Sequence, residues 1–231
     1  MAGTIILGID VESASADSAG FANYGAELFH QLDVPVTWYL TGKTLEQFPT
    51  EFQKLNHDKL IELQGHTYAH LLLKTVLMKI PRGLTIHNHT DWYLQPGGTL
   101  SEIDADLSKC QQIFQDVLGI RATALTGPWC YYRGLGDRLD LLALMRVYGF
   151  TCLRTFGRNE TDGQPVPLEW QPFFYTAQGY PEILECMIHD YQDEFYWQMF
   201  TQPPPGELYI THLQSVARQV AENNFVWSLC S

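Results

Sequence analysis

The sequence predicts an α/β fold: a single-domain, distorted (β/α) barrel of seven or eight strands. Apolar, strand-like runs alternate with helical patterns, and strand, helix, strand, helix, strand fit within residues 1–70. A length of 231 residues suits one domain of this class, and a hydrophobic fraction of 45% supplies a substantial core. Side chains suited to catalysis stand at the ends of several predicted strands, which is where such barrels collect them.

Composition and charge exclude several classes of partner. A net charge of −12 opposes binding to nucleic acid, whose phosphates require a basic surface, and to an anionic membrane surface. No window approaches the ~20 apolar residues of a membrane segment. The chain starts without a basic stretch followed by a long apolar run, which indicates no signal peptide and a cytoplasmic location; a removed leader stays open as the alternative. The five cysteines include no C-x-x-C pair, which favours free thiols.

The first predicted strand, Thr4 to Val11, ends in two acids. Asp10 and Glu12 are two residues apart, so on an extended chain both carboxylates point the same way. A lone pair of this kind is usually a pair of solvated loop acids, but a buried barrel strand would deliver these two to the catalytic rim. The elements expected next are a helix over residues 19–32, a strand over residues 34–42 and a helix over residues 45–55.

Two histidines follow the third predicted strand, residues 60–63. His66 and His70 are four residues apart, and they share one face if the chain turns helical just after the strand. Two imidazoles on one face can bind a single divalent metal, which is the commonest function of such a pair. For the pair taken alone, the alternative is two unrelated histidines at the start of a helix.

Residues 71–98 interrupt the alternation and predict an inserted loop or lid. The stretch contains His87 and His89, which could add a metal ligand or contact a substrate, although an H-x-H in a polar loop is more often only exposed. Trp92 and Tyr93 beside them could stack on the face of a sugar.

A long helix is expected over residues 99–118. Thr99 or Ser101 is the candidate N-cap, with Glu102 completing a capping box, and Gly119 ends the helix.

The second half of the chain supplies further strand ends. A strand over residues 122–125 leads into Thr126, Pro128 and Trp129, and strands over 182–188 and 208–212 end at His189 and His212. The other elements expected are helices over residues 137–148 and 215–223 and strands over residues 150–155 and 225–228. Because parallel strand ends meet on one face of a barrel, the following residues should converge there: Asp10, Glu12, His66, Pro128, His189 and His212.

Several stretches resemble, in order, the motifs of the polysaccharide deacetylases, the NodB-homology or family 4 carbohydrate esterases. The resemblance spans nearly the whole chain and implies a TIM-barrel-like fold; no stretch between residues 157 and 181 matches the fourth motif. The matching stretches are Gly8-Ile9-Asp10-Val11-Glu12 for F-D-x-D, residues 34–42 for I-P-A-T-F-F-L-x-G, Glu62 to His70 for E-I-x-N-H-[ST]-x-x-H, Thr126 to Trp129 for R-x-P-[YW], and Ile210-Thr211-His212 for L-x-H.

The resemblance implies a metal-dependent hydrolase that removes an acetyl or other acyl group from an N-acylated sugar or a related amide. By the motif match, Glu12, His66 and His70 hold one divalent metal ion. Zinc suits this ligand set best, and cobalt or nickel also fit. The metal polarises the amide carbonyl and acidifies its water, while Asp10 takes the proton.

The same match implies roles for residues from the second half of the chain. The backbone N–H of Trp129, after Pro128, would stabilise the oxyanion. His212 would protonate the leaving amine, and His189 competes for this role, with Asp190 beside it to orient its ring.

One departure from the motifs bears on activity: Thr126 stands where the third motif has an arginine that holds the catalytic Asp. Arg133 and Arg154 are candidate substitutes from neighbouring loops. Two alternatives therefore stay open. One is a small-molecule amidase or deformylase on the same fold, and the other is a non-catalytic carbohydrate-binding protein. The oligomeric state is not indicated.

Overall fold

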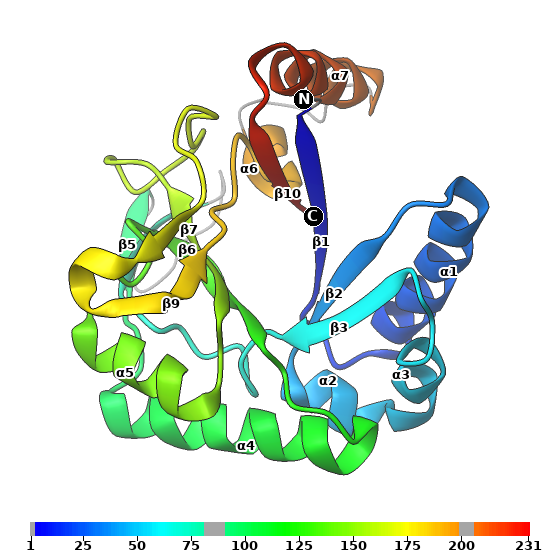
Figure 1. The fold of residues 1–231 in the computed structure, drawn as a ribbon, viewed down its shortest axis with the longest axis vertical. Coiled ribbons are helices and arrows are strands. Elements are labelled where there is room, and N and C mark those ends of the chain that lie inside the picture. The colour runs from blue at the N-terminus through cyan, green and yellow to red at the C-terminus, as the bar shows by residue number, and fades with distance from the viewer. Residues whose placement is uncertain (1–2, 81–90, 199–205) are drawn as a thin grey trace.

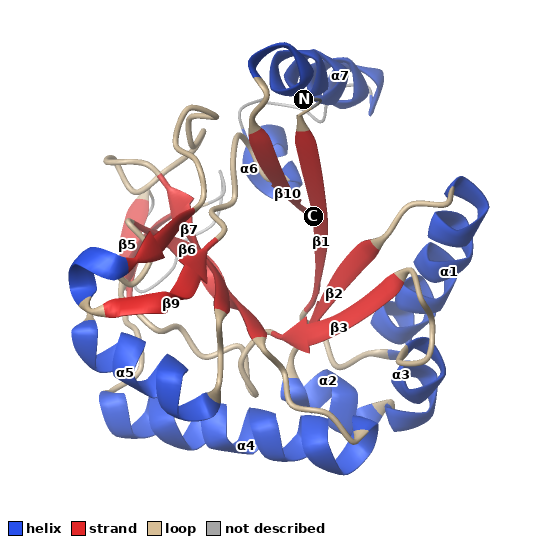
Figure 2. Ribbon diagram, viewed as in Figure 1, coloured by secondary structure: helices blue, strands red, loops and turns tan. Residues whose placement is uncertain are grey.

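The computed structural model describes residues 3–80, 91–198 and 206–231 and shows an α/β fold built on one large sheet (Figure 2). This sheet has 8 strands in the order β10-β1-β2-β3-β6-β7-β9-β8, and every neighbouring pair is parallel except β8 with β9. The predicted class and strand number are thus confirmed. The strands are β1 (Thr4–Val11), β2 (Val36–Leu40), β3 (Ile61–Gly65), β6 (Ala124–Tyr132), β7 (Cys152–Arg158), β8 (Phe173–Tyr175), β9 (Tyr180–Glu185) and β10 (Val226–Cys230).

Helices surround the curved sheet, with α4 lying below it in the view of Figure 1. The stretch expected as one helix over residues 45–55 is two helices, because Pro49 starts the second of them at its first turn. In the described part of the chain, no helix combines the length and apolar character of a membrane span. The helices are α1 (Ala16–Leu32), α2 (Gly42–Gln47), α3 (Pro49–Leu55), α4 (Leu100–Leu118), α5 (Leu139–Tyr148), α6 (Asp193–Gln198) and α7 (Gly206–Asn223), with a 3₁₀ turn at Thr176–Gln178.

The sheet curls back toward its own edge. Just beyond β9, the N–H of Ile188 donates to the carbonyl of Phe156 in β7 at 2.8 Å. The N–H of His189 then donates to the carbonyl of Ser228 in β10 at 3.1 Å. The continuation of β9 therefore links two strands that lie far apart in the strand order, and the parallel strand ends are brought around a common axis.

The prediction of a strand over residues 208–212 is wrong. These residues belong to α7, whose buried positions are Val216 and Val220. Leu208 and Ile210 are 47% and 55% exposed, so they are not the core of a strand. Two apolar residues at alternate positions mimic a strand, whereas the helical period appears only over the whole of α7.

Residues 71–98 contain a separate antiparallel hairpin, β4 (Val76–Lys79) with β5 (Trp92–Gln95). His87 and His89 lie outside the described residues. The capping box expected at Thr99 and Glu102 is present, and Gly119 has a left-handed φ of 71°.

Helix α1 packs on the sheet at one close contact. Trp38 of β2 is fully buried, and its indole lies against Phe21 and Phe29 of α1. A Cβ added at Gly25 would lie 2.7 Å from the Trp38 ring, whereas one at Gly20 would meet nothing within 4 Å. The absence of a side chain at Gly25 therefore lets the helix approach the indole.

We expect Gly25→Ala to lower the free energy of unfolding by about 1–3 kcal/mol, because the added methyl group overpacks the Trp38 contact. Gly20→Ala in the same helix is the matched control. It should raise the free energy of unfolding by about 0.5–1 kcal/mol through its greater helix propensity. Urea denaturation of both variants measures the difference. Equal stabilisation by both substitutions would contradict the contact.

Candidate active site

Three predicted ligand residues meet at the carboxyl ends of β1 and β3. Glu12 follows β1, and His66 and His70 follow β3. Glu12 Oε1 lies 3.4 Å from His66 Nε2 and 3.3 Å from His70 Nε2. One ligand atom from each residue fits within a span of 4.8 Å, so the three side chains can bind one ion.

The two histidines are brought together by a turn and not by the helical turn expected from their spacing. Thr67 and His70 have left-handed φ values of 59° and 57°, which only a firmly held loop maintains. Asp106 of α4 holds this loop by accepting hydrogen bonds from the N–H groups of Tyr68 at 2.6 Å and Ala69 at 3.0 Å. The ring centroids of the histidines are 4.9 Å apart as a result.

The ring of His66 is oriented for metal binding. Its Nδ1 lies 2.9 Å from the carbonyl oxygen of Thr126, which can only accept, so Nδ1 carries the hydrogen. The lone pair of Nε2 then faces Glu12. The Nε2 atoms of both histidines are buried without a hydrogen-bond partner in the described structure. These two nitrogens and the Glu12 carboxylate that they face could all bind one divalent cation, which would supply the partner that the nitrogens lack.

Neighbouring charges shift the pKa values of Glu12 and His66. Burial opposes ionisation of Glu12, but the imidazoles of His66 and His70 hold its pKa far below its usual range. Burial also opposes a charge on His66, yet the carboxylates of Asp10 and Glu12 raise its pKa. The carboxylate of Glu12 is therefore ionised at neutral pH, as a metal ligand must be.

Asp10 is paired with Arg154, which stands beside the residue that replaces the motif arginine. Thr126 of β6 is in register with Arg154 of β7, whose Nη1 donates to Thr126 Oγ1 at 3.2 Å. The same Nη1 lies 3.8 Å from Asp10 Oδ1. A Cβ at Gly8 would lie 2.2 Å from this nitrogen, so the glycine makes room for the guanidinium. Arg154 thus supplies a charge that Thr126 cannot; it is one of the two candidate substitutes that the sequence offers.

The other carboxylate oxygen of Asp10 also has a partner. The thiol of Cys230, at the end of β10, donates to Asp10 Oδ2 at 3.3 Å. Oδ1 is buried and has no hydrogen-bond partner in the described structure. It therefore keeps the capacity to accept a proton. The sequence does not indicate a role for Cys230, because a lone cysteine carries no signal of its own.

Pro128 and Trp129 lie in an irregular part of β6. The pairing of β6 with β7 breaks between Thr126 and Tyr131, and Trp129 and Cys130 have φ values of 60° and 49°. This break turns Trp129 into a cavity of about 350 Å³ that Asp10 and Glu12 also line.

His189 lies just beyond β9, whereas His212 lies in a helix and not at the strand end expected for it. His189 is fully buried: Nε2 donates to the carbonyl of Trp170 at 2.6 Å, and Nδ1 accepts from the N–H of Ser228 at 3.1 Å. Burial lowers its pKa, so the ring is neutral. His212 lies in α7 and its Nε2 is 2.5 Å from Asp190 Oδ2. Neither histidine lines the cavity of Asp10 and Glu12.

Comparisons with known proteins match this chain to one family and to several solved structures of the same fold. A sequence model of the polysaccharide deacetylases matches residues 9–135. A polysaccharide deacetylase candidate from Mycobacterium smegmatis matches with a TM-score of 0.64 and 12% identity, over 98% of this chain and 75% of that one. PuuE allantoinase matches with a TM-score of 0.63 and 11% identity, over 98% of this chain and 76% of that one. A CE4-family pseudoenzyme from Bacillus anthracis matches with a TM-score of 0.50 and 12% identity, over 99% of this chain and 64% of that one. No curated protein sequence gives a significant match.

At these identities the structural similarity shows the fold alone. A deacetylase candidate, an allantoinase and a pseudoenzyme share it, so the fold does not decide the reaction. The side chains at the strand ends carry that information.

We expect Arg154→Met to lower the free energy of unfolding by about 3–5 kcal/mol, because it leaves the buried carboxylate of Asp10 without a counter-charge. The double variant Asp10→Asn with Arg154→Met removes both charges and should recover part of this loss. Urea denaturation of the single and double variants tests the pair. If the double variant is less stable than Arg154→Met alone, the two side chains do not form a pair.

Proposed function

This chain belongs to the polysaccharide deacetylase family, and on that premise we propose that it is a metal-dependent hydrolase that removes an acyl group from an N-acylated substrate. The observation that carries the proposal is the convergence of Glu12, His66 and His70 on one point, with Asp10 beside them in the same cavity wall as Glu12. A carboxylate–imidazole metal site next to a second, separate carboxylate is what metal-assisted amide hydrolysis requires.

Glu12, His66 and His70 would hold the cation, and zinc suits them best, with cobalt or nickel as alternatives. A bound divalent cation would supply Lewis-acid polarisation of the acyl carbonyl and would acidify a water molecule. Asp106, through the turn of residues 67–69, and Thr126, through His66 Nδ1, fix the two rings in place.

Asp10 is the proposed general base. Its Oδ1 has no hydrogen-bond partner in the described structure, and Arg154 and Cys230 fix the orientation of the carboxylate. The backbone N–H of Trp129 is the proposed donor to the oxyanion, since residues 127–130 lie outside the pairing of β6 with β7. The Arg158 side chain donates to the carbonyl of Trp129 at 2.8 Å and so restrains this peptide.

His212 is the proposed general acid, with Asp190 orienting its ring. A carboxylate hydrogen-bonded to one ring nitrogen is the usual way in which a catalytic imidazole is positioned. His212 also contacts the ring of Tyr191, and the residues directly after Tyr191 line the cavity of Asp10 and Glu12. His189 is unsuited to proton transfer because both of its ring nitrogens are engaged by the backbone.

A non-catalytic carbohydrate-binding protein is the second candidate, and Thr126 in place of the motif arginine is the observation that favours it. Arg154 of β7, the strand next to that of Thr126, weakens this argument because its guanidinium lies near Asp10 and can replace the missing arginine. The two candidates are separated by loading the protein with zinc and measuring acetate release from N-acetylated sugars and small amides. Full zinc occupancy with no acetate released from any substrate would favour the binding protein.

We predict that His66→Ala and His70→Ala each lose bound zinc, because two protein ligands hold the ion far more weakly than three. Asp10→Asn is the control: it should keep zinc near the wild-type level and lose hydrolysis, since the base and not the ligand set is changed. Zinc content after dialysis against a buffered free-zinc solution, measured beside the hydrolysis rate, gives both values. A zinc content equal to that of the wild type in both histidine variants would contradict the assignment of His66 and His70 as ligands.

We further predict that His212→Gln lowers kcat by about 10²–10⁴-fold, the usual contribution of general acid catalysis. Zinc content should not change, and the fall in rate at alkaline pH should flatten because no imidazole is left to lose its proton. His189→Gln should leave the shape of the pH–rate profile unchanged. A His212→Gln enzyme with wild-type kcat, beside a His189→Gln enzyme that loses its alkaline limb, would transfer the role to His189.

A further inference from the structure

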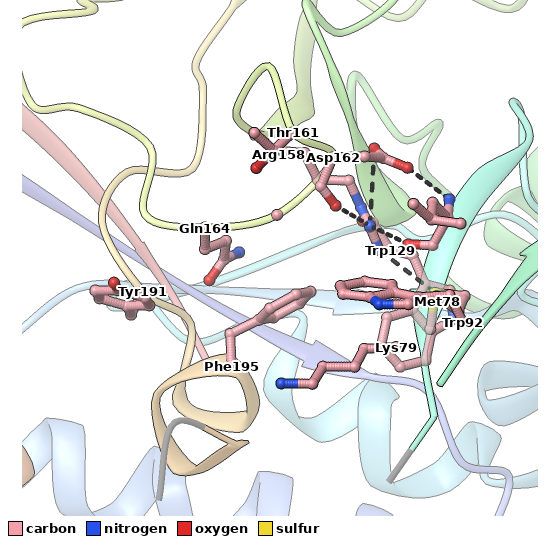
Figure 3. Close-up of a pocket in the computed structure, with 12 residues that line it drawn as sticks. Met78, Lys79, Trp92, Trp129, Arg158, Thr161, Asp162, Gln164, Tyr191 and Phe195 are labelled. Carbon is pink, nitrogen blue, oxygen red and sulfur yellow. Dashed lines mark hydrogen bonds and ion pairs between the residues drawn. The ribbon is translucent and has the colours of Figure 1, made fainter. Parts of the chain in front are cut away.

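A second cavity, of about 250 Å³, adjoins the cavity of Asp10 and Glu12, because Trp129 lines both. The β4–β5 hairpin, the loop after β7 and the start of α6 form its other walls. Figure 3 shows Tyr191 and Gln164 on one side of it and Met78 and Trp92 on the other. We call it the aromatic pocket and define it by Met78, Lys79, Trp92, Trp129, Tyr191 and Phe195.

The charged groups at the aromatic pocket are used inside the protein. Arg158 is 1% exposed, and it donates to the carbonyls of Trp129, Leu77 and Asp162 at 2.8, 3.0 and 2.7 Å. Its remaining contact is with the sulfur of Met78 at 3.4 Å. Asp162 Oδ2 accepts the N–H of Leu77 at 2.5 Å and also lies near the guanidinium. These groups hold the hairpin against the Trp129 peptide and have little capacity left for a ligand.

The amide of Gln164 and the hydroxyl of Thr161 are engaged as well. Gln164 Nε2 donates to the carbonyl of Gly157 at 3.1 Å and to Gln192 Oε1 at 3.0 Å, and its Oε1 accepts from the N–H of Gln192 at 2.8 Å. Thr161 Oγ1 donates to Asn159 Oδ1 at 2.8 Å. A sugar ring carries several hydroxyl groups that need partners, and these side chains are already committed to the protein.

Most of the other side chains that line the pocket are aromatic. Trp92, Trp129, Tyr191 and Phe195 present ring carbons, and the guanidinium carbon of Arg158 lies 5.5 Å from the centre of the Phe195 ring. A volume of about 250 Å³ is below the range of ~300–1,000 Å³ that is usual for drug-sized ligands. The pocket therefore fits one flat apolar ring better than a polymer chain.

Lys79 is a cation at this pocket for which the described residues supply no ion pair. It lies in β4 and is exposed. The charges of Arg158 and Asp162 lie 3.7 Å apart and largely cancel. The described residues that line the pocket therefore carry a net positive charge, although the chain as a whole carries −12. A ring with an anionic substituent matches this arrangement.

We propose that the substrate is a small N-acylated arylamine with an anionic ring substituent, whose ring occupies the aromatic pocket while its amide lies beside Asp10 and Glu12. This inference rests on the proposed hydrolase function. The family reaction releases a small acyl group, so the larger part of the substrate belongs to the amine. Water adds hydroxyl to the carbonyl carbon and hydrogen to the nitrogen, the C–N bond breaks, and a carboxylic acid and an arylamine result.

The first test compares three amides with the zinc-loaded enzyme: 4-acetamidobenzoate, acetanilide and N-acetylglucosamine. We expect kcat/KM to fall in that order, by at least about tenfold between the first and the last. Lys79→Ala should remove most of the advantage of 4-acetamidobenzoate over acetanilide. Faster hydrolysis of N-acetylglucosamine than of both aryl amides would overturn the substrate class while leaving the hydrolase function intact.

The second test locates the ring. Phe195→Ala and Trp92→Ala should each raise KM for 4-acetamidobenzoate by about three- to tenfold with little change in kcat, as loss of one aromatic contact predicts. Trp92 is 46% exposed, so its variant should fold even if Phe195→Ala does not. Phe174→Ala, which removes a 55% exposed aromatic side chain of β8, is the control and should leave KM unchanged. Equal KM values in all four proteins would overturn the pocket assignment.

A binding measurement separates this inference from the proposed function. Calorimetric titration with 4-aminobenzoate, the expected product, requires no turnover. If no amide is hydrolysed but 4-aminobenzoate binds the wild type and binds Trp92→Ala at least threefold more weakly, the pocket stands and the hydrolase function fails. If N-acetylglucosamine is hydrolysed and 4-aminobenzoate does not bind, the function stands and the aromatic pocket is overturned.

Discussion

The buried guanidinium of Arg154 is the interaction on which the rest of the site depends. It donates to Ser228 Oγ at 3.3 Å and to the carbonyl of Leu229 at 3.1 Å in β10, and it lies near Asp10 of β1. It also stands 4.6 Å above the ring centre of Tyr39 in β2. One side chain from β7 thus contacts strands on the far side of the curled sheet. The same contacts that bring those strands together also orient the candidate base.

The features that could be predicted from the sequence depend on neighbouring residues. The buried strand before Asp10 and Glu12, and the helix that begins at Thr99 and ends at Gly119, are signalled by local apolar runs and capping residues. Parallel strands place their carboxyl ends together, so acids and histidines at such ends could be expected to meet without knowledge of the strand order. His66, which directly follows β3, meets Glu12 for this reason.

The features that could not be predicted depend on long-range packing. The turn that joins His66 to His70 requires Asp106 of α4, which lies 38 and 37 residues after its partners Tyr68 and Ala69, whereas the spacing of the histidines alone suggests a helical turn. The partnership of Asp10 with Arg154 requires the register of β6 with β7. For His212, two apolar residues at alternate positions in a short window resembled a strand, and only packing along all of α7 shows the helix.

Strand β7 carries two buried arginines, one beside the candidate base and one at the aromatic pocket. Arg154 and Arg158 are four residues apart on it and are each 1% exposed; the first contacts the candidate base and the second restrains the Trp129 peptide. The match to the polysaccharide deacetylase model ends at residue 135, so both lie beyond it. The candidate ligand residues Glu12, His66 and His70 lie within the matched part. Arg154 and Cys230, which orient the candidate base, come from the remainder. The aromatic pocket draws on both parts: Met78, Lys79, Trp92 and Trp129 lie within the matched residues, and Tyr191 and Phe195 lie beyond them.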